Sequence, residues 1–313
     1  MADVVLGFGS SHAPQLRMPA SDWPNLIKKD TQDPRYDYQE VLKHAKPNME
    51  EELTPEVMSL RYDSNHRAMA ILKQKLDAAA PEAIVVFGDD QHEQFHDNNM
   101  PMFSIYRGAS LPVRSRNGGP AWNTGERPAE ADHPAAPELA EHLIHELVES
   151  GFDISTCNEL RDEVGVGHAF NFLYQYIMPE AEIPVVPVMV NAFFPPNQPT
   201  PRRSYQVGQA VREALDAWGG NKKVAVMASG GLSHFIIDEE IDHMLLDAMK
   251  NKDEEALANL PRDRFMRLGT TEGTNWIALA GAMQKEDMTL IDYVPCYRTP
   301  AGTGCAMAFA YWE

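Results

Sequence analysis

Three histidines in this 313-residue chain follow runs of residues that favour β-strands. His12 follows the first run, His92 the second and His234 a later one, while Glu272 opens a predicted helix. Imidazole nitrogens together with one carboxylate suit iron(II), because this donor set leaves coordination positions open for substrate and oxygen. A single histidine after a strand is more often structural, so spacing alone gives only a hypothesis of a metal site.

The elements that would position these residues are those of an α/β domain. Apolar runs at 83–87 and 223–228 alternate with stretches of helical periodicity such as 55–80. We predict one domain over residues 1–313, with a mixed, mostly parallel sheet flanked by helices. An insertion at about 23–54 is a candidate cover for the site. Ligands of such folds bind beyond the carboxyl ends of the strands, where these histidines fall.

Two segments carry less regular patterns. Residues 107–137 are rich in glycine, proline and polar residues, and predict a long surface loop. Residues 183–191 read as a strand, and their prolines place it at an edge or a bulge of the sheet.

The overall charge restricts the partners. The chain has 27 basic and 46 acidic residues, for a net charge of -19, which repels nucleic acids and anionic membranes. We therefore expect neither as a partner, although one local arginine could still bind a small anionic substrate. The three cysteines lack CxxC spacing, and the first residues lack the basic region of a signal peptide. These features predict a cytoplasmic protein.

Four motifs taken together resemble the class III extradiol ring-cleavage dioxygenases. The resemblance is strongest to the catalytic subunit of protocatechuate 4,5-dioxygenase and to the gallate and 3-O-methylgallate dioxygenases. Each motif is unremarkable alone, but their order and separation make a chance match improbable. The motifs are GFGSSHAP at 7–14, GVGHAF at 165–170, GGLSH at 230–234 and the pair Thr271-Glu272.

The resemblance implies an iron(II) ion held by two histidines and one glutamate. His12 matches the first histidine of the family and Glu272 matches the glutamate. The second histidine normally follows an aspartate directly after the second strand, where an ungapped match places Gln91. A glutamine oxygen is a weaker ligand than imidazole, so we expect the adjacent His92 to be the ligand, with Gln91 as the competing candidate.

The resemblance also implies roles for further residues. His234 matches the acid/base histidine, which suits an imidazole that titrates near neutral pH. His168 matches a second catalytic histidine, although its apolar neighbours fit the start of a packed helix equally well. Arg298 and Thr303 are candidates for substrate binding, with Arg298 as the anchor of a substrate carboxylate. Alternatively, Arg298 is a surface residue that pairs with one of the many acids.

The function implied is an Fe(2+)-dependent dioxygenase that inserts O2 into the ring of a catechol-type aromatic acid. Protocatechuate, gallate and 3-O-methylgallate are not distinguished by the sequence. A zinc-dependent hydrolase is an alternative, since the same donors bind zinc. A non-enzymatic binding protein on the same fold is another, and Gln91 is its only support. A homodimer or a small helical partner subunit is expected for the assembly.

Overall fold

A computed structural model describes residues 1–114, 130–180 and 183–313. Its centre is a nine-stranded mixed sheet with the order β10-β11-β1-β8-β2-β7-β3-β6, and β9 pairs with β11. The strands are β1 (Asp3–Ser10), β2 (Ala83–Asp89), β3 (Phe103–Tyr106), β6 (Ser155–Cys157), β7 (Val185–Val190), β8 (Lys223–Ser229), β9 (His234–Ile236), β10 (Met288–Tyr297) and β11 (Thr303–Trp312).

The middle of the sheet is parallel. Strand β8 pairs in parallel with both β1 and β2, and β2 pairs in parallel with β7. Strands β10 and β11 extend the sheet in antiparallel fashion beyond β1, and β3 is antiparallel to β7. The predicted α/β fold with a mixed, mostly parallel sheet is confirmed. The carboxyl ends of four adjacent strands therefore meet at one edge.

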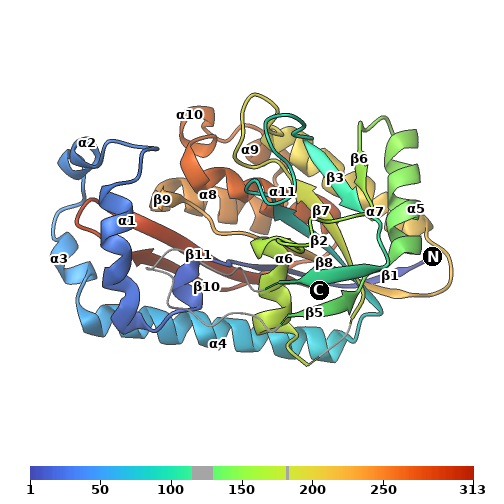
Figure 1. Cartoon of the computed structure of the whole chain (residues 1–313), viewed down its shortest axis with the longest axis horizontal. Coiled ribbons are helices and arrows are strands. Elements are labelled where there is room, and N and C mark those ends of the chain that lie inside the picture. Colours follow the sequence, from blue (N-terminus) through green and yellow to red (C-terminus); the bar gives the residue numbers. More distant parts are fainter. Residues whose placement is uncertain (115–129, 181–182) are drawn as a thin grey trace.

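Helices cover both faces of the sheet (Figure 1). The long helix α4 (Pro55–Ala79) lies along one face, against β1, β10 and β11. It begins at Pro55, which needs no amide hydrogen there, and the Thr54 side chain accepts a hydrogen bond from the Val57 amide. The opposite face carries α5 (Pro137–Glu149), α7 (Pro201–Ala217), α8 (Glu239–Lys250) and α11 (Gly273–Ala282).

Side chains alternate between the two faces of the sheet along each strand, and they form one hydrophobic core on each face. Ile84 and Val86 of β2 belong to the cluster that includes the apolar face of α4. Val85 and Phe87 point the other way, into the cluster that includes α5, α7 and α11. Because β2 is buried on both faces, it reads as one continuous apolar run rather than as an alternating pattern.

Two local predictions were wrong. Strand β7 lies inside the sheet between β2 and β3, and its register with both strands is continuous, although its prolines predicted an edge or a bulge. Pro187 is tolerated because β3 pairs only with Val188–Val190, so the missing amide lies outside that ladder. Within the predicted loop at 107–137, β4 (Ser110–Val113) pairs with β5 (Ala131–Pro134). The rest of that prediction, residues 115–129, lies outside the described residues.

The segment at 20–54 is built from short helices and packs at one end of the molecule (Figure 1). The extent of the insertion and its role as a cover stay predictions. Its helices are η2 (Ala20–Leu26), α1 (Ile27–Thr31), α2 (Tyr38–Lys43) and α3 (Met49–Glu52). The other short helices of the described chain are η1 (Pro14–Leu16), α6 (His168–Phe172), η3 (Leu173–Ile177), α9 (Glu254–Ala258), α10 (Arg262–Phe265) and η4 (Leu268–Glu272).

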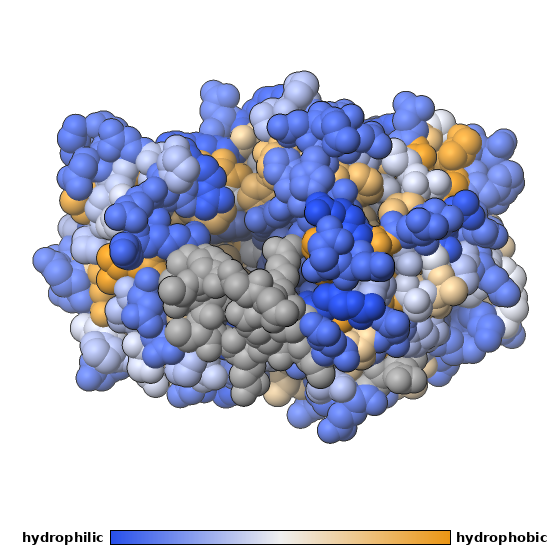
Figure 2. Space-filling model, viewed as in Figure 1, coloured by the Kyte–Doolittle hydropathy of each residue, from blue (hydrophilic) through white to orange (hydrophobic). Residues whose placement is uncertain are grey.

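The surface is predominantly polar. Figure 2 shows mostly hydrophilic residues on one face, with hydrophobic residues in small scattered patches. Among the described residues, every helix is too short or too polar to cross a lipid bilayer.

Candidate metal centre and active site

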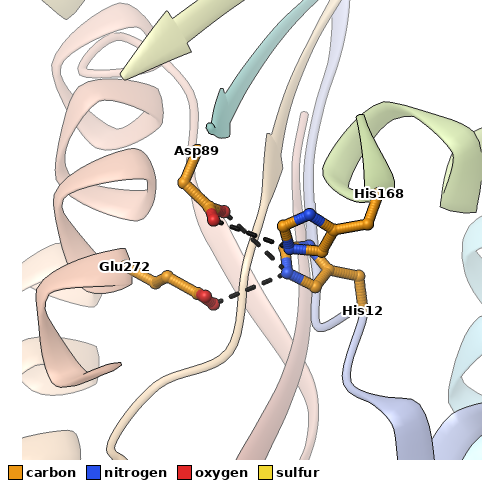
Figure 3. Close-up of side chains that lie close together, drawn as sticks. All are labelled: His12, Asp89, His168 and Glu272. Carbon is orange, nitrogen blue, oxygen red and sulfur yellow. Dashed lines mark ion pairs between the residues drawn. The ribbon is translucent and has the colours of Figure 1, made fainter. Parts of the chain in front are cut away.

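Four potential metal ligands converge at the carboxyl edge of the parallel strands. His12 follows β1, Asp89 ends β2, His168 opens α6 and Glu272 ends η4. Their ligand atoms all lie within 4.8 Å of one another. In Figure 3 the two carboxylates face the two imidazoles across a small gap. Segments far apart in the sequence thus supply two nitrogen and two carboxylate donors to one point.

The distances in this cluster are too long for hydrogen bonds. Nε2 of His12 lies 3.8 Å from Oδ1 of Asp89 and 3.7 Å from Oε2 of Glu272. Nε2 of His168 lies 3.6 Å from Oδ2 of Asp89. Donors that each bind a cation at about 2.0–2.2 Å lie roughly 3–4 Å apart, so the spacing fits a divalent ion held between them.

Hydrogen bonds fix the orientation of His12. Its Nδ1 lies 3.0 Å from Oγ of Ser229, which donates its own proton to the Ala169 carbonyl at 2.6 Å. Nδ1 of His12 must therefore carry the proton. This leaves Nε2 unprotonated, with its lone pair directed at the carboxylates. Burial lowers the pKa of His12 to about 3, so the imidazole is neutral at neutral pH, as a metal ligand must be.

His168 is held in a similar way by a carboxylate. Its Nδ1 lies 2.7 Å from Oε1 of Glu93, which also accepts a hydrogen bond from the His168 amide at 2.9 Å. Burial opposes protonation, but Glu93 and Asp89 outweigh it and raise the pKa of His168 to about 9. His168 is therefore a proton donor near the cluster when no cation is present.

The two buried carboxylates favour a cation. Oδ1 of Asp89 accepts no hydrogen bond from the residues that the structure describes. Burial and the nearby Glu272 raise the pKa of Asp89. Burial also opposes ionisation of Glu272, but His234 and His12 lower its pKa, and its Oε2 accepts a 2.7 Å hydrogen bond from the Gly231 amide. Two buried carboxylates with two imidazoles suit a divalent metal ion.

His234 lies at the edge of the same cluster. Its Nδ1 donates to the Leu232 carbonyl at 2.8 Å, and its Nε2 lies 3.2 Å from Oε1 of Glu272. Burial opposes protonation, but Glu272 outweighs it and raises the pKa of His234. The ring packs so closely on Gly269 that a Cβ there would lie 2.1 Å from Cδ2 of His234. A side chain at position 269 would therefore displace the imidazole.

A buried network supports the loop before His234. Asp242 of α8 accepts hydrogen bonds from the Ser233 amide at 2.8 Å and the Ser233 hydroxyl at 2.6 Å. The hydroxyl of Tyr293 donates to the same carboxylate at 2.8 Å. These bonds anchor the turn that places His234 beside Glu272.

The structure brings Gln91 to the cluster and leaves His92 outside it. The side-chain nitrogen Nε2 of Gln91 lies 3.1 Å from Oδ2 of Asp89 and 3.3 Å from Oε1 of Glu272. The His92 ring stacks on Phe194 with a centroid separation of 3.7 Å. The side chain of Asp90 fixes this turn by accepting hydrogen bonds from the amides of residues 94 and 95, so that Gln91 points inward and His92 outward. The expected ligand role of His92 thus has no support from its position.

Arg298 and Thr303 are occupied by a carboxylate of the protein. Nε of Arg298 donates to Oδ2 of Asp30 at 2.9 Å, and the Thr303 hydroxyl donates to the same oxygen at 2.7 Å. All three side chains are buried. Arg298 also lines the cavity described next. It is therefore neither the surface residue of the alternative interpretation nor an uncommitted anchor.

A cavity of about 250 Å³ opens onto the cluster. His12, Gln91, His168, His234 and Glu272 line it. Its remaining described lining residues are Ala13, Pro14, Arg17, Lys29, Arg35, Gly231, Phe235, Arg298, Gly304 and Cys305. A small molecule in this cavity would contact both the potential metal ligands and the candidate acid/base histidine.

Three residues of the site were missed by the sequence argument. Asp89 ends a buried strand next to Asp90, a position at which α/β folds place ligands, so its location could have indicated it. Glu93 and Ser229 act through His168 and His12, and their contacts span 75 and 217 positions of the chain. Such contacts depend on the fold, and no local pattern indicates them.

Comparison with known proteins gives a family match over most of the chain. The family model described as "Catalytic LigB subunit of aromatic ring-opening dioxygenase" matches residues 41–307. The matched range contains Asp89, His168 and Glu272, while His12 precedes it.

Individual relatives are similar over shorter stretches. A 2,3-dihydroxyphenylpropionate/2,3-dihydroxicinnamic acid 1,2-dioxygenase of Klebsiella pneumoniae (strain 342) is 28% identical over 172 residues, covering 55% of this chain and 49% of the relative. A gallate dioxygenase of Pseudomonas putida is 30% identical over 174 residues, covering 51% of this chain and 48% of the relative. The chain spans about half the length of the curated relatives it matches.

Proposed function

Because the chain belongs to the family of catalytic LigB subunits of aromatic ring-opening dioxygenases, we propose that it opens the ring of a catechol-type aromatic acid with O2 in the extradiol manner. The observation that carries the proposal is the cluster of His12, Asp89, His168 and Glu272, which opens onto a cavity that His234 also lines. The relatives named for 2,3-dihydroxyphenylpropionate and gallate support a dihydroxylated aromatic acid as the substrate class.

The cofactor of the proposed reaction is Fe(2+), held by His12, Asp89 and Glu272. This donor set is supported by the lone pair of His12, by the ionised Glu272 and by Oδ1 of Asp89, which accepts no hydrogen bond from the described residues. Asp89 takes the place expected for His92, and Gln91 assists by hydrogen bonding to Asp89 and Glu272. When bound, iron(II) lets dioxygen react with a closed-shell substrate, which is otherwise a slow reaction.

His234 and His168 handle protons in this proposal. His234 lines the cavity and its Nδ1 donates to the Leu232 carbonyl, so Nε2 is the atom that accepts the proton of a catechol hydroxyl. His168 holds a proton because Glu93 stabilises its cationic form, and it donates that proton as the ring opens. Both imidazoles line the cavity, from which substrate displaces water.

The assembly and location belong to the same proposal. Three free thiols, Cys157, Cys296 and Cys305, support the reducing environment of the cytoplasm. A homodimer or a complex with a small helical subunit stays a prediction. Light scattering of the purified protein tests it by giving the molar mass of the assembly.

The activity is tested by oxygen uptake of anaerobically iron(II)-loaded protein with protocatechuate, gallate and 3-O-methylgallate. We expect uptake with at least one of them, together with a ring-opened product. His234→Gln should reduce kcat by about 10²–10⁴-fold, since it removes a general base. His145→Gln, a change at an exposed histidine of α5, should leave kcat unchanged.

A different outcome would redirect the assignment. Stoichiometric zinc in the purified protein without oxygen uptake would favour the hydrolase. Binding of a catechol without turnover at any metal loading would favour the non-enzymatic binding protein.

A further inference from the structure

A second cavity adjoins the one that opens onto the cluster. It has a volume of about 330 Å³, and Arg35 and Phe235 line both cavities. Its other described lining residues are Phe193, Pro195, Gln198, Met266 and Leu268. Because the two cavities share part of their lining, a molecule bound at the cluster lies next to the second cavity.

The second cavity is lined mainly by apolar side chains. Four of them are half-buried, so that part of each stays exposed, namely Phe193, Phe235, Met266 and Leu268. The face of the protein shown in Figure 2 is predominantly hydrophilic, and the chain has a net charge of -19. Apolar side chains that gather around a hollow on such a protein are typical of a ligand-binding site.

The polar groups in this lining already have partners within the protein. The Arg35 guanidinium binds the Asp33 carboxylate, with Nε 2.7 Å from Oδ1, and its Cζ lies 3.4 Å from the centroid of the Phe235 ring. The side-chain nitrogen of Gln198 donates a hydrogen bond to the Ala192 carbonyl. A polar ligand would compete with these contacts, whereas an apolar group leaves them in place. The lining therefore favours an apolar ligand.

The apolar lining extends to the candidate acid/base histidine. The Phe235 ring meets the His234 ring edge to face, with centroids 5.0 Å apart, and the Phe193 ring lies 6.2 Å from the same imidazole. Leu268 directly precedes Gly269, on which the His234 ring packs. The second cavity thus lies beside the proposed reaction centre and not at a remote surface.

We propose that the second cavity binds an apolar substituent, aryl or alkyl, on the catechol ring of the substrate. The dihydroxylated ring lies against the cluster in the first cavity, and the substituent extends past Phe235 into the second. An apolar cavity of about 150 Å³ is enough to bind benzene, so a cavity of about 330 Å³ has room for a second ring. This assignment rests on the proposed function and narrows its substrates to catechols that carry such a substituent.

The experiment compares catechol with 3-phenylcatechol and 4-phenylcatechol, which carry the same apolar ring at the two inequivalent positions. Anaerobic titration calorimetry with the iron(II)-loaded full chain gives each Kd, and oxygen uptake gives each kcat/KM. We expect wild type to bind one phenylcatechol at least about tenfold more tightly than catechol, which corresponds to about 1.4 kcal/mol. The heat-capacity change of its binding should also be more negative, because more apolar surface is buried.

Variants of Met266 test whether the substituent occupies this cavity. Met266 lines the second cavity and is not among the described lining residues of the first. Met266→Trp fills the space with an indole, so the ratio of the catechol Kd to the phenylcatechol Kd should lose most of its excess over one. Met266→Gln places an amide in the apolar lining without added bulk and should also lower the ratio.

Two controls make the test specific to this cavity. Met266→Leu keeps an apolar side chain of similar volume and should retain most of the preference for the phenylcatechol. Met244→Trp makes the same change as Met266→Trp at an exposed methionine of α8, and should leave the ratio at the wild-type value.

The proposal is overturned if wild type binds neither phenylcatechol more tightly than catechol. It is also overturned if the preference survives in both Met266→Trp and Met266→Gln. An equal loss in Met244→Trp would have the same consequence, because the effect would then not belong to this cavity.

This proposal and the dioxygenase proposal fail in different ways. If catechols support oxygen uptake but the phenyl group gives no preference, ring opening stands and the second cavity has no role in substrate binding. If calorimetry shows a preference that Met266→Trp removes, while no catechol supports oxygen uptake, the role of the second cavity stands and the dioxygenase proposal fails.

Discussion

Asp89 and His92 are close in sequence but occupy different environments, and the contrast bears on which of them belongs to the proposed metal site. Asp89 is buried at the end of β2 and faces His12, whereas His92 stacks on Phe194 and its Nε2 lies 3.4 Å from Asp97. The turn held by Asp90 separates the two side chains. A donor that ends a buried strand needs no movement to reach the cluster, so the geometry favours Asp89.

We therefore expect Asp89→Asn to weaken iron binding by at least about tenfold, since it replaces an anionic donor with a neutral amide. His92→Ala should retain the iron affinity of wild type, because the imidazole lies outside the cluster. Iron per chain, measured by elemental analysis after dialysis against graded chelator, gives both affinities.

Gln91→Ala provides a comparison within the same turn. It should weaken iron binding less than Asp89→Asn, because Gln91 acts through hydrogen bonds to the two carboxylates. Loss of iron in His92→Ala together with its retention in Asp89→Asn would reinstate the sequence prediction of His92 as the ligand.

Helix α1 carries Lys29, one of the residues that line the cavity, and the buried Asp30 of the same helix links it to the sheet. Asp30 of α1 binds Arg298 and also Thr303 at the start of β11. Because Lys29 is the neighbour of Asp30, this attachment sets where the Lys29 ammonium lies. Asp30 thus joins α1 to the sheet beside the cavity that Lys29 and Arg298 line.

Removal of this attachment should destabilise the whole chain. Asp30→Ala leaves the buried guanidinium of Arg298 without its partner, and we expect the free energy of unfolding in urea to fall by about 3–5 kcal/mol. The double variant Asp30→Ala with Arg298→Met should recover part of this loss, because it removes the uncompensated charge.

Strictly additive effects of the two changes would contradict this account of the pair. Lys28→Met on the exposed side of α1 serves as the control, and its unfolding free energy should stay within about 0.5 kcal/mol of wild type.

Local patterns predicted the elements better than the contacts between them. The buried strand β2 and the helix α4 follow from an apolar run and from helical periodicity, which depend on near neighbours. The interior position of β7 could not be predicted in this way, because Pro187 is tolerated through the short pairing of β7 with β3, which is a tertiary contact. The partner of Arg298 lies 268 positions away, so no local pattern could identify it.

The same limit applies to the candidate site. His12, His168, His234 and Glu272 could be proposed from strand ends and from motif resemblance, and the structure brings all four together. The direction of the turn at residues 90–95 could not be proposed, since it depends on hydrogen bonds of the Asp90 side chain. Sequence therefore indicates which strand ends form the site, but tertiary contacts decide which side chain of each turn faces it.

At the scale of the whole molecule, the proposed metal site joins strands and helices from both halves of the chain. His12 follows β1, Asp89 ends β2, and Glu272 precedes α11, which packs on the face of the sheet opposite α4. An ion bound by these residues is bound only by the folded chain, since they are 260 positions apart from first to last and separate on unfolding. Metal binding must therefore stabilise the global fold.

We expect iron(II) to raise the free energy of unfolding by about 2.7 kcal/mol when its free concentration is 100 times the Kd. Anaerobic thermal unfolding with and without iron(II) measures this as a rise in Tm that increases with iron concentration. His12→Ala should abolish most of the rise, whereas His145→Gln should preserve it, because that histidine is exposed on α5. An iron-dependent rise that persists in His12→Ala would locate the stabilising ion elsewhere, because the neutral imidazole of His12 is central to the proposed donor set.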